Sequence, residues 1–341
     1  MKLKKTKRIF AILLSLLLVA AVMAGCGSTD SDDSQASGGD DQYTIGVVVK
    51  LTGIAYFNRL EEGVQKAADE LGVDAFVVGP TEEDSAEQIK LIEDLISQEV
   101  DAIIVVPTDA EAIASVLDKA RDAGIVVLSN ESPDQAGVDY DIELVDNQKF
   151  AEAAAEDLAQ QIGGSGQYAQ FVGSLTQPLH KTWADYVEAY LEENYPDIEL
   201  VTDRLPVGES ADDARSKTLE LLKAYPDLDG IISFGSQGPI GAAEAIIEKD
   251  LVGEFTILGN LMPSEGISYL ESGAIYEGLL WDPSDSGYAA ITTAVALLNG
   301  EDVTASDFEV SGIGTPTLNG TTLAFDKTLF ITSENAEELG F

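Results

Sequence analysis

From Tyr43 onward, short apolar stretches alternate with segments whose apolar residues recur every three or four positions. The stretch from Tyr43 to Val49 is rich in β-branched residues and carries no charge, which is typical of a buried parallel strand. The segment from Phe57 to Leu71 has helical spacing, and Gly72 stands where a helix would end. Further strands are predicted at 73–78, 102–106 and 125–128, with helices at 85–98 and 110–123. This alternation predicts βαβ units with right-handed crossovers.

A second series of the same kind begins near Phe150. It predicts helices at 151–161, 183–193, 212–224, 240–249, 264–272 and 286–298, and strands at 168–172, 198–201, 230–234, 256–258 and 274–281. The body from residue 43 to residue 341 is too long for one average domain and fits two. The pattern therefore predicts an α/β fold of two similar lobes with parallel sheets. We assign residues 43–143 and 262–282 to an N-terminal lobe, and residues 144–261 and 283–341 to a C-terminal lobe.

The beginning of the chain has a different pattern. Basic residues between Lys2 and Arg8 precede an apolar run from Ile9 to Ala24, and Gly25 leads to the only cysteine, Cys26. A basic head, an apolar middle and a small-residue end are typical of a secretion signal. The residues before Cys26 resemble a bacterial lipobox, which implies that residues 1–25 are a lipoprotein signal peptide and that Cys26 is lipidated.

Residues 26–42 are polar, acidic and rich in glycine and serine, so they are predicted to be a flexible tether. The protein is then expected outside the cell's cytoplasm, held by lipid on the outer face of the cytoplasmic membrane. An uncleaved membrane anchor is the alternative, although the apolar run is short for a span of about 20 residues. An ordinary buried thiol at Cys26 is disfavoured by the polar tract that follows it.

Charge and composition exclude several classes of function. The formal net charge is −42, and it becomes −47 when the five basic residues of the signal peptide are removed. Nucleic acid is a poor partner for such a chain, because binding depends on Lys and Arg that neutralise phosphate. With one cysteine and one histidine, neither an internal disulfide, a thiolate metal site nor a multi-histidine centre is expected. We expect no cofactor, no metal and a monomer.

The predicted fold indicates where a ligand would bind. In open parallel sheets, ligands lie outside the carboxyl ends of the strands. The residues that follow the predicted strands there, and that we take as candidate ligand-binding residues, are Lys50, Tyr56, Phe57, Asn130, Glu131, His180, Ser236, Gln237, Asn260, Trp281 and Asp282. They combine aromatic rings, amides, carboxylates and an ammonium group. This set suits a small polyhydroxylated molecule, because hydroxyls need both donors and acceptors and the C–H face of a sugar packs on a flat ring.

Each of these residues also has a structural interpretation. A lysine at a strand end is usually a solvated side chain, and Glu131 and Asp282 can be ordinary surface acids in an acidic chain. The aromatic residues can serve core packing, and His180 can be a surface loop residue. The turn Gly163–Gly166 is not a phosphate loop, because it ends a helix, precedes a strand and is not followed by Lys-Ser/Thr.

Several stretches resemble the type I periplasmic binding proteins that serve ABC importers for simple sugars, most closely the branch that binds rhamnose and autoinducer-2 (AI-2). The stretches are Val49–Gly53 with Tyr56 and Phe57, Gly79–Glu82, Val100–Val105, Ala224–Ile232, and Gly278–Pro283 with Gly287 and Tyr288. The resemblance implies two Rossmann-like lobes joined by a three-segment hinge, with the ligand trapped between them. It supports Lys50, Asn130, Glu131, Ser236 and Asp282 as ligand contacts.

The chain also departs from the AI-2 receptors. They carry an Asp-Gln pair before the helical tryptophan, where this chain has Leu179 and His180, and a Pro-Asp-Ala where it has Phe234–Ser236. The resemblance therefore favours a sugar or a sugar-like polyol over AI-2, which remains the alternative ligand.

The functional expectation is a substrate-binding protein that changes shape on binding and is recognised by an ABC permease. An enzyme acting on a sugar is a rival, because paired carboxylates can catalyse glycoside hydrolysis, but no nucleophile–base pair surrounds His180. A transcriptional regulator would need a basic DNA-reading head. A receptor that presents its closed form to a sensor kinase is a further alternative.

Overall fold

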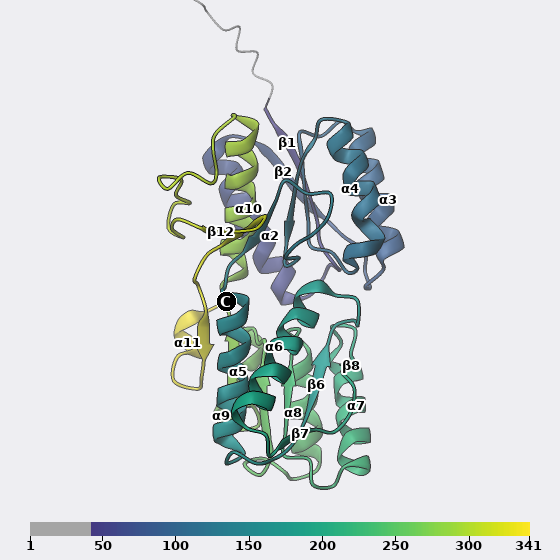
Figure 1. Cartoon of the computed structure of the whole chain (residues 1–341), viewed down its shortest axis with the longest axis vertical. Coiled ribbons are helices and arrows are strands. Elements are labelled where there is room, and N and C mark those ends of the chain that lie inside the picture. Colours follow the sequence, from purple (N-terminus) through teal and green to yellow (C-terminus); the bar gives the residue numbers. More distant parts are fainter. Residues whose placement is uncertain (1–41) are drawn as a thin grey trace, which may run out of the picture. The chain divides into compact units, whose positions relative to one another are not determined.

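The computed structural model describes residues 42–341, and the predicted signal peptide, Cys26 and most of the predicted tether lie outside the described residues. The described chain forms two seven-stranded sheets, each made mostly of parallel strands and flanked by helices (Figure 1). This confirms the prediction of an α/β fold with two lobes.

The first sheet has the strand order β12-β13-β5-β4-β3-β1-β2. Its strands are β1 (Thr44–Val48), β2 (Asp74–Val78), β3 (Ala102–Val105), β4 (Val126–Asn130), β5 (Tyr140–Glu143), β12 (Thr317–Asn319) and β13 (Thr322–Ala324). The helices of this lobe are α2 (Ala55–Leu71), α3 (Ser85–Ser97), α4 (Ala110–Asp122) and α10 (Pro283–Leu298). Only β12 runs antiparallel to its neighbour, β13, within this sheet.

The second sheet has the order β14-β11-β10-β9-β6-β7, with β8 pairing to β6. Its strands are β6 (Gly166–Val172), β7 (Ile198–Leu200), β8 (Leu205–Pro206), β9 (Gly230–Ser233), β10 (Thr256–Gly259), β11 (Glu277–Leu280) and β14 (Leu329–Ile331). The helices of this lobe are α5 (Asn147–Gln161), α6 (Pro178–Asn194), α7 (Ala211–Ala224), α8 (Gly238–Glu248), α9 (Pro263–Ser272) and α11 (Ala336–Leu339).

Strand β1 explains why the first sheet is covered on both faces. Side chains alternate between the faces of a strand, so Ile45 and Val47 pack in one apolar cluster while Val48 packs in another. The second cluster holds the apolar faces of α3 and α4, and the first extends over α2 and α10. An uninterrupted apolar strand is what such a two-sided environment requires.

The sequence fixes several helix starts through a capping side chain. The carboxylates of Asp84, Asp109 and Asp146 accept hydrogen bonds from backbone N–H groups in the first turns of α3, α4 and α5, and the hydroxyl of Ser210 does the same for α7. Each side chain satisfies a donor that has no partner within its helix. These helices therefore begin within four residues of where the sequence places them.

The chain crosses between the two sheets three times within the described residues. The first crossing lies between β5 and α5, the second between β11 and α10, and the third between β13 and β14. Trp281 and Asp282 form the second crossing, and their backbone therefore belongs to the hinge. These crossings agree with the three-segment hinge that the resemblance implies.

The late elements differ from the predicted lobe assignment. Residues 262–282 are predicted in the N-terminal lobe, but β11 pairs with β10 and β14 in the second sheet. Residues 283–341 are predicted in the C-terminal lobe. There β14 and α11 do lie, whereas α10 packs against α2 and β13 pairs with β5 in the first sheet. Periodicity identifies strands and helices but not the sheet to which they add, and the second and third crossings fall inside these ranges.

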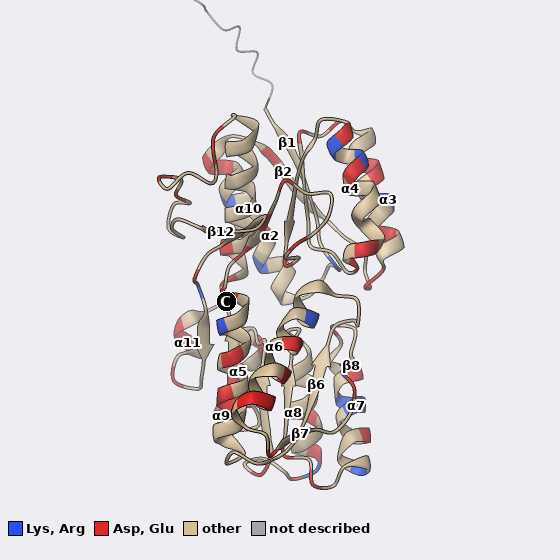
Figure 2. Cartoon of the chain, viewed as in Figure 1, with Lys and Arg blue, Asp and Glu red and all other residues tan. Residues whose placement is uncertain are grey.

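Acidic residues are spread over the helices of both lobes, and basic residues are few (Figure 2). This distribution matches the net charge of −42 and leaves no basic face of the kind that nucleic acid needs on the helices drawn there. Between residues 42 and 341, no helix has both the length and the apolar character to cross a bilayer.

Candidate functional site

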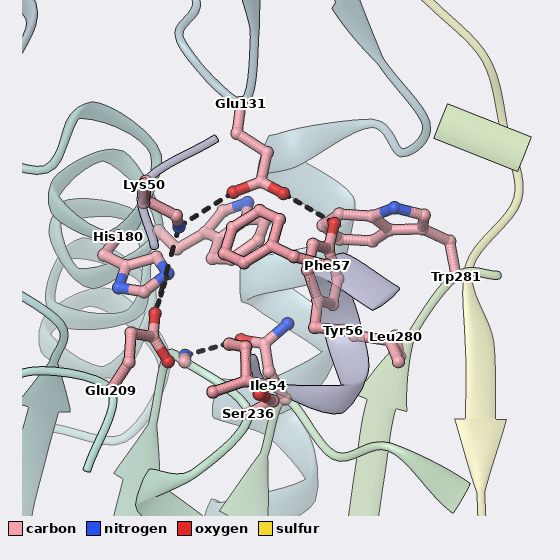
Figure 3. A pocket seen from close by; sticks show the side chains of 13 residues that line it. Lys50, Ile54, Tyr56, Phe57, Glu131, His180, Glu209, Ser236, Leu280 and Trp281 are labelled. Carbon is pink, nitrogen blue, oxygen red and sulfur yellow. Dashed lines mark hydrogen bonds and ion pairs between the residues drawn. The ribbon is translucent and has the colours of Figure 1, made fainter. Parts of the chain in front are cut away.

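A cavity lies between the two lobes, at the carboxyl ends of their parallel strands. The empty space within it is about 310 Å³, a figure that includes its opening to solvent. The residues that line it are Lys50, Ile54, Tyr56, Phe57, Glu131, His180, Trp183, Glu209, Gly235, Ser236, Asn260, Leu280 and Trp281 (Figure 3).

Lys50 and Glu131 form the polar wall that the first lobe contributes. Lys50 follows β1 and Glu131 follows β4, so both stand at strand ends of the same sheet. The Lys50 ammonium lies 3.0 Å from Glu131 Oε2, and only 3% and 5% of the two side chains are exposed. Burial would lower the pKa of Lys50, but the carboxylates of Glu131, Glu209 and Glu83 outweigh it and raise this pKa above its ordinary value. Lys50 is therefore a permanent cation in the cavity.

Tyr56 completes this polar wall from the first turn of α2. Its hydroxyl donates to Glu131 Oε1 over 2.5 Å, so both carboxylate oxygens of Glu131 have partners. Burial and the neighbouring carboxylate of Glu131 raise the pKa of Tyr56 well above its usual range, which keeps the phenol protonated as a donor. Glu131 itself has a backbone φ of 61°, a left-handed conformation that is unusual for a side chain of its size. Such strained residues concentrate at functional sites.

Glu209 is the acidic group of the opposite wall. It follows β8 in a turn of the second lobe, with a φ of 51°. Its Oε1 lies 3.9 Å from the Lys50 ammonium, and its buried Oε2 has no hydrogen-bond partner. Burial raises the pKa of Glu209 to about 8; Lys50 opposes this effect, and Glu83 and Glu131 add to it. A carboxyl group that is protonated near neutral pH can donate as well as accept a hydrogen bond.

Two glycines make room for the Glu209 carboxylate. A Cβ at Gly235 would lie 2.6 Å from Glu209 Oε2, and one at Gly173 would lie 3.2 Å from Glu209 Oε1. Gly235 also has a φ of 105°, which other residues rarely adopt. The turns after β6 and β9 are therefore shaped around this carboxylate.

His180 is neutral and held in one orientation at the start of α6. Its Nδ1 accepts a hydrogen bond of 3.0 Å from the Gly173 N–H, so the ring proton sits on Nε2. Nε2 lies 3.8 Å from Glu209 Oε1. The Gln177 side-chain nitrogen is 3.1 Å from Nε2 but is itself a donor, so the amide accepts this proton only with its oxygen in that place. Burial, with a smaller contribution from the charge of Lys50, lowers the pKa of His180 well below its usual range. The imidazole is thus a neutral hydrogen-bonding group and not a cation.

Aromatic rings form the apolar wall. Trp183 and Trp281 meet with ring centres 5.9 Å apart, and Tyr56 lies edge-on to Trp281 at 6.1 Å. The indole N–H of Trp281 donates to Ser286 Oγ over 2.8 Å, and that of Trp183 donates to Asn147 Oδ1 over 2.9 Å. Because these bonds satisfy the only polar atom of each indole, the rings offer apolar surface to the cavity.

Eight of the eleven predicted site residues line this cavity: Lys50, Tyr56, Phe57, Glu131, His180, Ser236, Asn260 and Trp281. Ser236 Oγ is buried there without a hydrogen-bond partner. Asn260 accepts from the Gly235 N–H and donates to the Leu279 carbonyl, each over 3.4 Å. That these residues contact a ligand stays a prediction.

The other three predicted residues do not line the cavity. The side-chain N–H of Asn130 donates to the Ile142 carbonyl over 2.7 Å, and this hydrogen bond links β4 to β5. Gln237 donates to Glu265 over 2.9 Å outside the cavity. Asp282 caps α10 and accepts two hydrogen bonds from the Arg59 guanidinium, of 2.9 and 2.7 Å. All three follow strands, but Gln237 and Asp282 are paired with side chains outside the cavity, and Asn130, whose buried Oδ1 has no hydrogen-bond partner, does not line it.

Glu209 and Trp183 are cavity residues that the sequence analysis missed. Glu209 follows a strand of two residues, which is too short to have a recognisable period. Trp183 lies in α6, and the sequence analysis included it only as part of a predicted helix. The one available signal was the sequence Val207-Gly208-Glu209, in which an acid follows a glycine at a strand end.

No group of three or more histidine, cysteine, aspartate or glutamate side chains within residues 42–341 has the geometry of a metal site. The arrangement offers hydrogen bonds of both kinds, one ammonium group and a flat apolar wall. Two hinged lobes with such a cavity between them define a class of protein, the two-lobed small-molecule binding proteins.

Sequence comparison agrees with this class and identifies the family. The profile of the periplasmic binding protein domain matches residues 45–302. The chain belongs to this family, as the resemblance at the sequence level implied. It is similar to the ribose import binding protein of Bacillus subtilis, with 25% identity over 87% of this chain and 95% of that protein. It is also similar to a xylitol-binding protein of Mycolicibacterium smegmatis, with 26% identity over 84% of this chain and 81% of that protein.

Solved structures share the fold. The LsrB protein of Clostridium saccharobutylicum in complex with AI-2 superposes with a TM-score of 0.80 and 22% identity, covering 87% of this chain and 100% of that one. A solute-binding protein of an ABC transporter from Clostridium phytofermentas with bound L-rhamnose gives a TM-score of 0.81 and 23% identity, covering 87% and 98%. Both structures thus share the fold that the resemblance implied.

Proposed function

We propose that this chain is the substrate-binding protein of an ABC importer and that it binds a small sugar or sugar-like polyol in the cavity between its lobes. The observation that carries the proposal is the composition of the cavity, whose polar groups come from both lobes and whose apolar wall consists of indole and phenol rings. The named relatives that bind ribose and xylitol support the same ligand class.

The polar groups of the cavity match a polyol in kind. Lys50 is a donor, Glu131 is an acceptor, and Ser236 and Glu209 have buried oxygens without partners. A hydrogen bond to a charged group contributes roughly 1.5–3 kcal/mol. A few such bonds, less the cost of immobilising the ligand, reach micromolar affinity, which corresponds to about −8 kcal/mol.

Binding by closure follows from the same geometry. A ligand that contacts Glu131 in one lobe and Glu209 in the other binds the closed form more tightly than the open form, and only such differential affinity can drive a conformational change. The permease is proposed to recognise the closed form. The protein is further proposed to act as a monomer outside the cytoplasm, held by a lipid on Cys26.

The test is calorimetry of pentoses, hexoses, deoxysugars, xylitol and AI-2 with protein purified from expression of the full chain, without denaturation. At least one neutral or substituted sugar is expected to bind with micromolar affinity or better. Lys50→Met should weaken that binding at least tenfold, because it removes the cavity's ammonium group. Lys90→Met, which removes an exposed lysine of the same lobe, serves as the control and should bind as the unaltered protein does.

Failure of every member of this panel, and of the corresponding amino sugars, to bind would contradict the proposed ligand class. AI-2 as the tightest ligand would favour the alternative of an AI-2 receptor, for which the shared fold of the LsrB complex is the supporting observation.

A sugar-active enzyme is the rival function, because Glu131 and Glu209 are two carboxyl groups on one cavity. We propose instead that the ligand leaves unaltered. Both oxygens of Glu131 are already hydrogen-bonded, and the ring nitrogens of the neutral His180 face Gly173 and Gln177. Incubation of the binding sugar and its methyl glycosides with the protein, followed by chromatography, should return the starting compounds. Appearance of a product would favour the enzyme.

A further inference from the structure

The cavity contains an excess of buried acidic groups. Lys50 is the only basic side chain among its lining residues, and it shares the cavity with Glu131 and Glu209. A third carboxyl group, that of Glu83 in the loop between β2 and α3, is close enough to act on Lys50. His180 adds no charge, because burial keeps its imidazole neutral.

Lys50 and Glu131 form an ion pair whose two charges compensate each other. Their side chains are 3.0 Å apart, and the second oxygen of Glu131 accepts the Tyr56 hydroxyl. This pair forms entirely within the first lobe and needs no ligand to complete it.

Glu209 and Glu83 lack a positively charged partner as close as the one that Glu131 has. Glu209 Oε1 is 3.9 Å from the Lys50 ammonium, and Glu209 Oε2 and Glu83 Oε1 are buried without a hydrogen-bond partner. The two carboxyl groups come from opposite lobes and meet at Gly173, where an added Cβ would lie 3.2 Å from Glu209 Oε1 and 3.3 Å from Glu83 Oε1. Closure of the lobes therefore brings two carboxyl groups together beside Gly173, whose lack of a side chain leaves room for both.

Burying a carboxylate without a partner is costly, so such a group either takes up a proton or acquires a cation. In the protein without a ligand, Glu209 holds a proton at neutral pH, because burial raises its pKa to about 8. The indole and phenol rings of Trp183, Trp281 and Tyr56 also line the cavity, and aromatic rings attract cations. Lys50, 3.9 Å from Glu209, is the one cation among the lining residues, against the carboxyl groups of Glu131, Glu209 and the nearby Glu83. The excess of carboxyl groups therefore favours a positive charge on the ligand.

We infer that the ligand carries a protonated nitrogen beside its hydroxyl groups, as an amino sugar does, and that this ammonium group is bound by Glu209. The inference rests on the proposed function and narrows its substrate class. On binding, the ligand ammonium takes the place of the proton on Glu209. A neutral sugar would leave Glu209 protonated and would bring no positive charge to the carboxyl groups of Glu83 and Glu209.

The experiment is calorimetry at pH 7 with three pairs of ligands that differ only at carbon 2: glucosamine and glucose, galactosamine and galactose, mannosamine and mannose. In at least one pair the amino sugar should bind at least tenfold more tightly than the neutral sugar. Glu209→Gln should remove this preference, since an amide cannot pair with the ammonium. Glu199→Gln, which removes an exposed carboxylate from the same lobe, should retain it.

A second readout does not depend on any variant. Repeating the titrations in buffers of different ionisation enthalpy measures protons exchanged on binding. The amino sugar should release protons, because the ammonium displaces the Glu209 proton, and the neutral sugar should release none.

The outcomes separate this inference from the proposed function. If a neutral sugar binds as tightly as its amino partner or more tightly, or if no proton is released, the cationic ligand is wrong and the sugar-binding function stands. If no amino sugar, neutral sugar or polyol binds, the proposed function itself fails.

Discussion

At the scale of single residues, the Lys50–Glu131 pair is a buried ion pair with 3% and 5% of its side chains exposed. Removing one partner of such a pair leaves an uncompensated charge in the interior and destabilises a protein by about 3–5 kcal/mol. Glu131→Gln is therefore expected to lower the free energy of unfolding by up to that amount, less any compensation from Glu209, whose Oε1 lies 3.9 Å from the Lys50 ammonium. The exposed pair Lys119–Glu93, at 3.1 Å, is the matched control, and Glu93→Gln should cost about 0–1 kcal/mol.

Urea denaturation of both variants measures the two values. A double variant, Lys50→Met with Glu131→Gln, should lose less than the sum of the single losses, because neither charge remains buried alone. Additive losses would contradict the view that the two side chains stabilise each other.

Glu209 makes stability depend on pH in an unusual direction. Its pKa is raised from the ordinary value of 4.5 to about 8, so between these values the folded chain holds a proton that the unfolded chain has lost. Stability supplied by this group is therefore present below pH 4.5 and is lost as the pH rises through 8. The loss between pH 5 and pH 8 is on the order of 2–4 kcal/mol.

Denaturation midpoints at pH 5 and pH 8 test this dependence. Glu209→Gln should flatten the decline, whereas Glu199→Gln should leave it as it is. The raised pKa values of Asp141 and Glu143 act in the same direction and persist in both variants, so some decline should remain. A Glu209→Gln protein that loses as much stability as the unaltered one would show that Glu209 is ionised in the fold.

At the scale of elements, two glycines allow α2 and α10 to pack closely. A Cβ at Gly63 would lie 1.8 Å from the Ser284 carbonyl oxygen, and one at Gly287 would lie 2.2 Å from that of Leu60. Both clashes are with backbone, which cannot move aside as a side chain can. Because α10 follows directly on the hinge residues Trp281 and Asp282, displacing it would also disturb the cavity.

Gly63→Ala is accordingly expected to destabilise the protein by about 1–3 kcal/mol, despite alanine's higher helix propensity. Glu61→Ala, at an exposed position of the same helix, should change stability by less than about 0.5 kcal/mol. Thermal denaturation of both variants makes the comparison. Equal stability of the two would contradict close packing of α2 on α10.

The sequence predicts the elements that carry a regular apolar period and misses those that do not. The predicted strand at 102–106 is β3, Ala102–Val105, and the predicted helix at 85–98 is α3, Ser85–Ser97. Strand β5 was missed because its sequence, Tyr-Asp-Ile-Glu, buries two acids where the pattern leads one to expect apolar residues. Strand β8 has only two residues, so the sequence pattern predicts neither this strand nor a site residue at Glu209, which follows it.

The sequence predicts those residues of the candidate site that lie at the ends of apolar strands. Lys50, Glu131 and Ser236 could be named because each follows an apolar strand within a few residues. Asn130 and Asp282 also stand at strand ends, yet the Asn130 side-chain N–H is bonded to the Ile142 carbonyl, the Asp282 carboxylate is paired with the Arg59 guanidinium, and neither residue lines the cavity. Which strand-end residue faces a cavity depends on contacts between segments far apart in the chain, and no local pattern contains that information.

At the scale of the whole molecule, the cavity depends on contacts across the two lobes. Lys50 of the first lobe lies 3.9 Å from Glu209 of the second, and the Thr176 hydroxyl donates to the Thr108 carbonyl over 3.5 Å. Tyr56 of α2 also packs edge-on against Trp281 of the second crossing, and one apolar cluster extends through both lobes. A ligand that binds both lobes at once would favour the closed form over the open form.

The sugar that binds in calorimetry is therefore expected to make the protein more compact in solution. Small-angle X-ray scattering should give a smaller radius of gyration with saturating sugar than without it, because the ligand stabilises the closed form alone. Lys50→Met at the same sugar concentration should not contract, and Lys90→Met should contract fully. If calorimetry records binding while the scattering stays the same, the sugar occupies a cavity that is already closed, and the permease must recognise something other than closure.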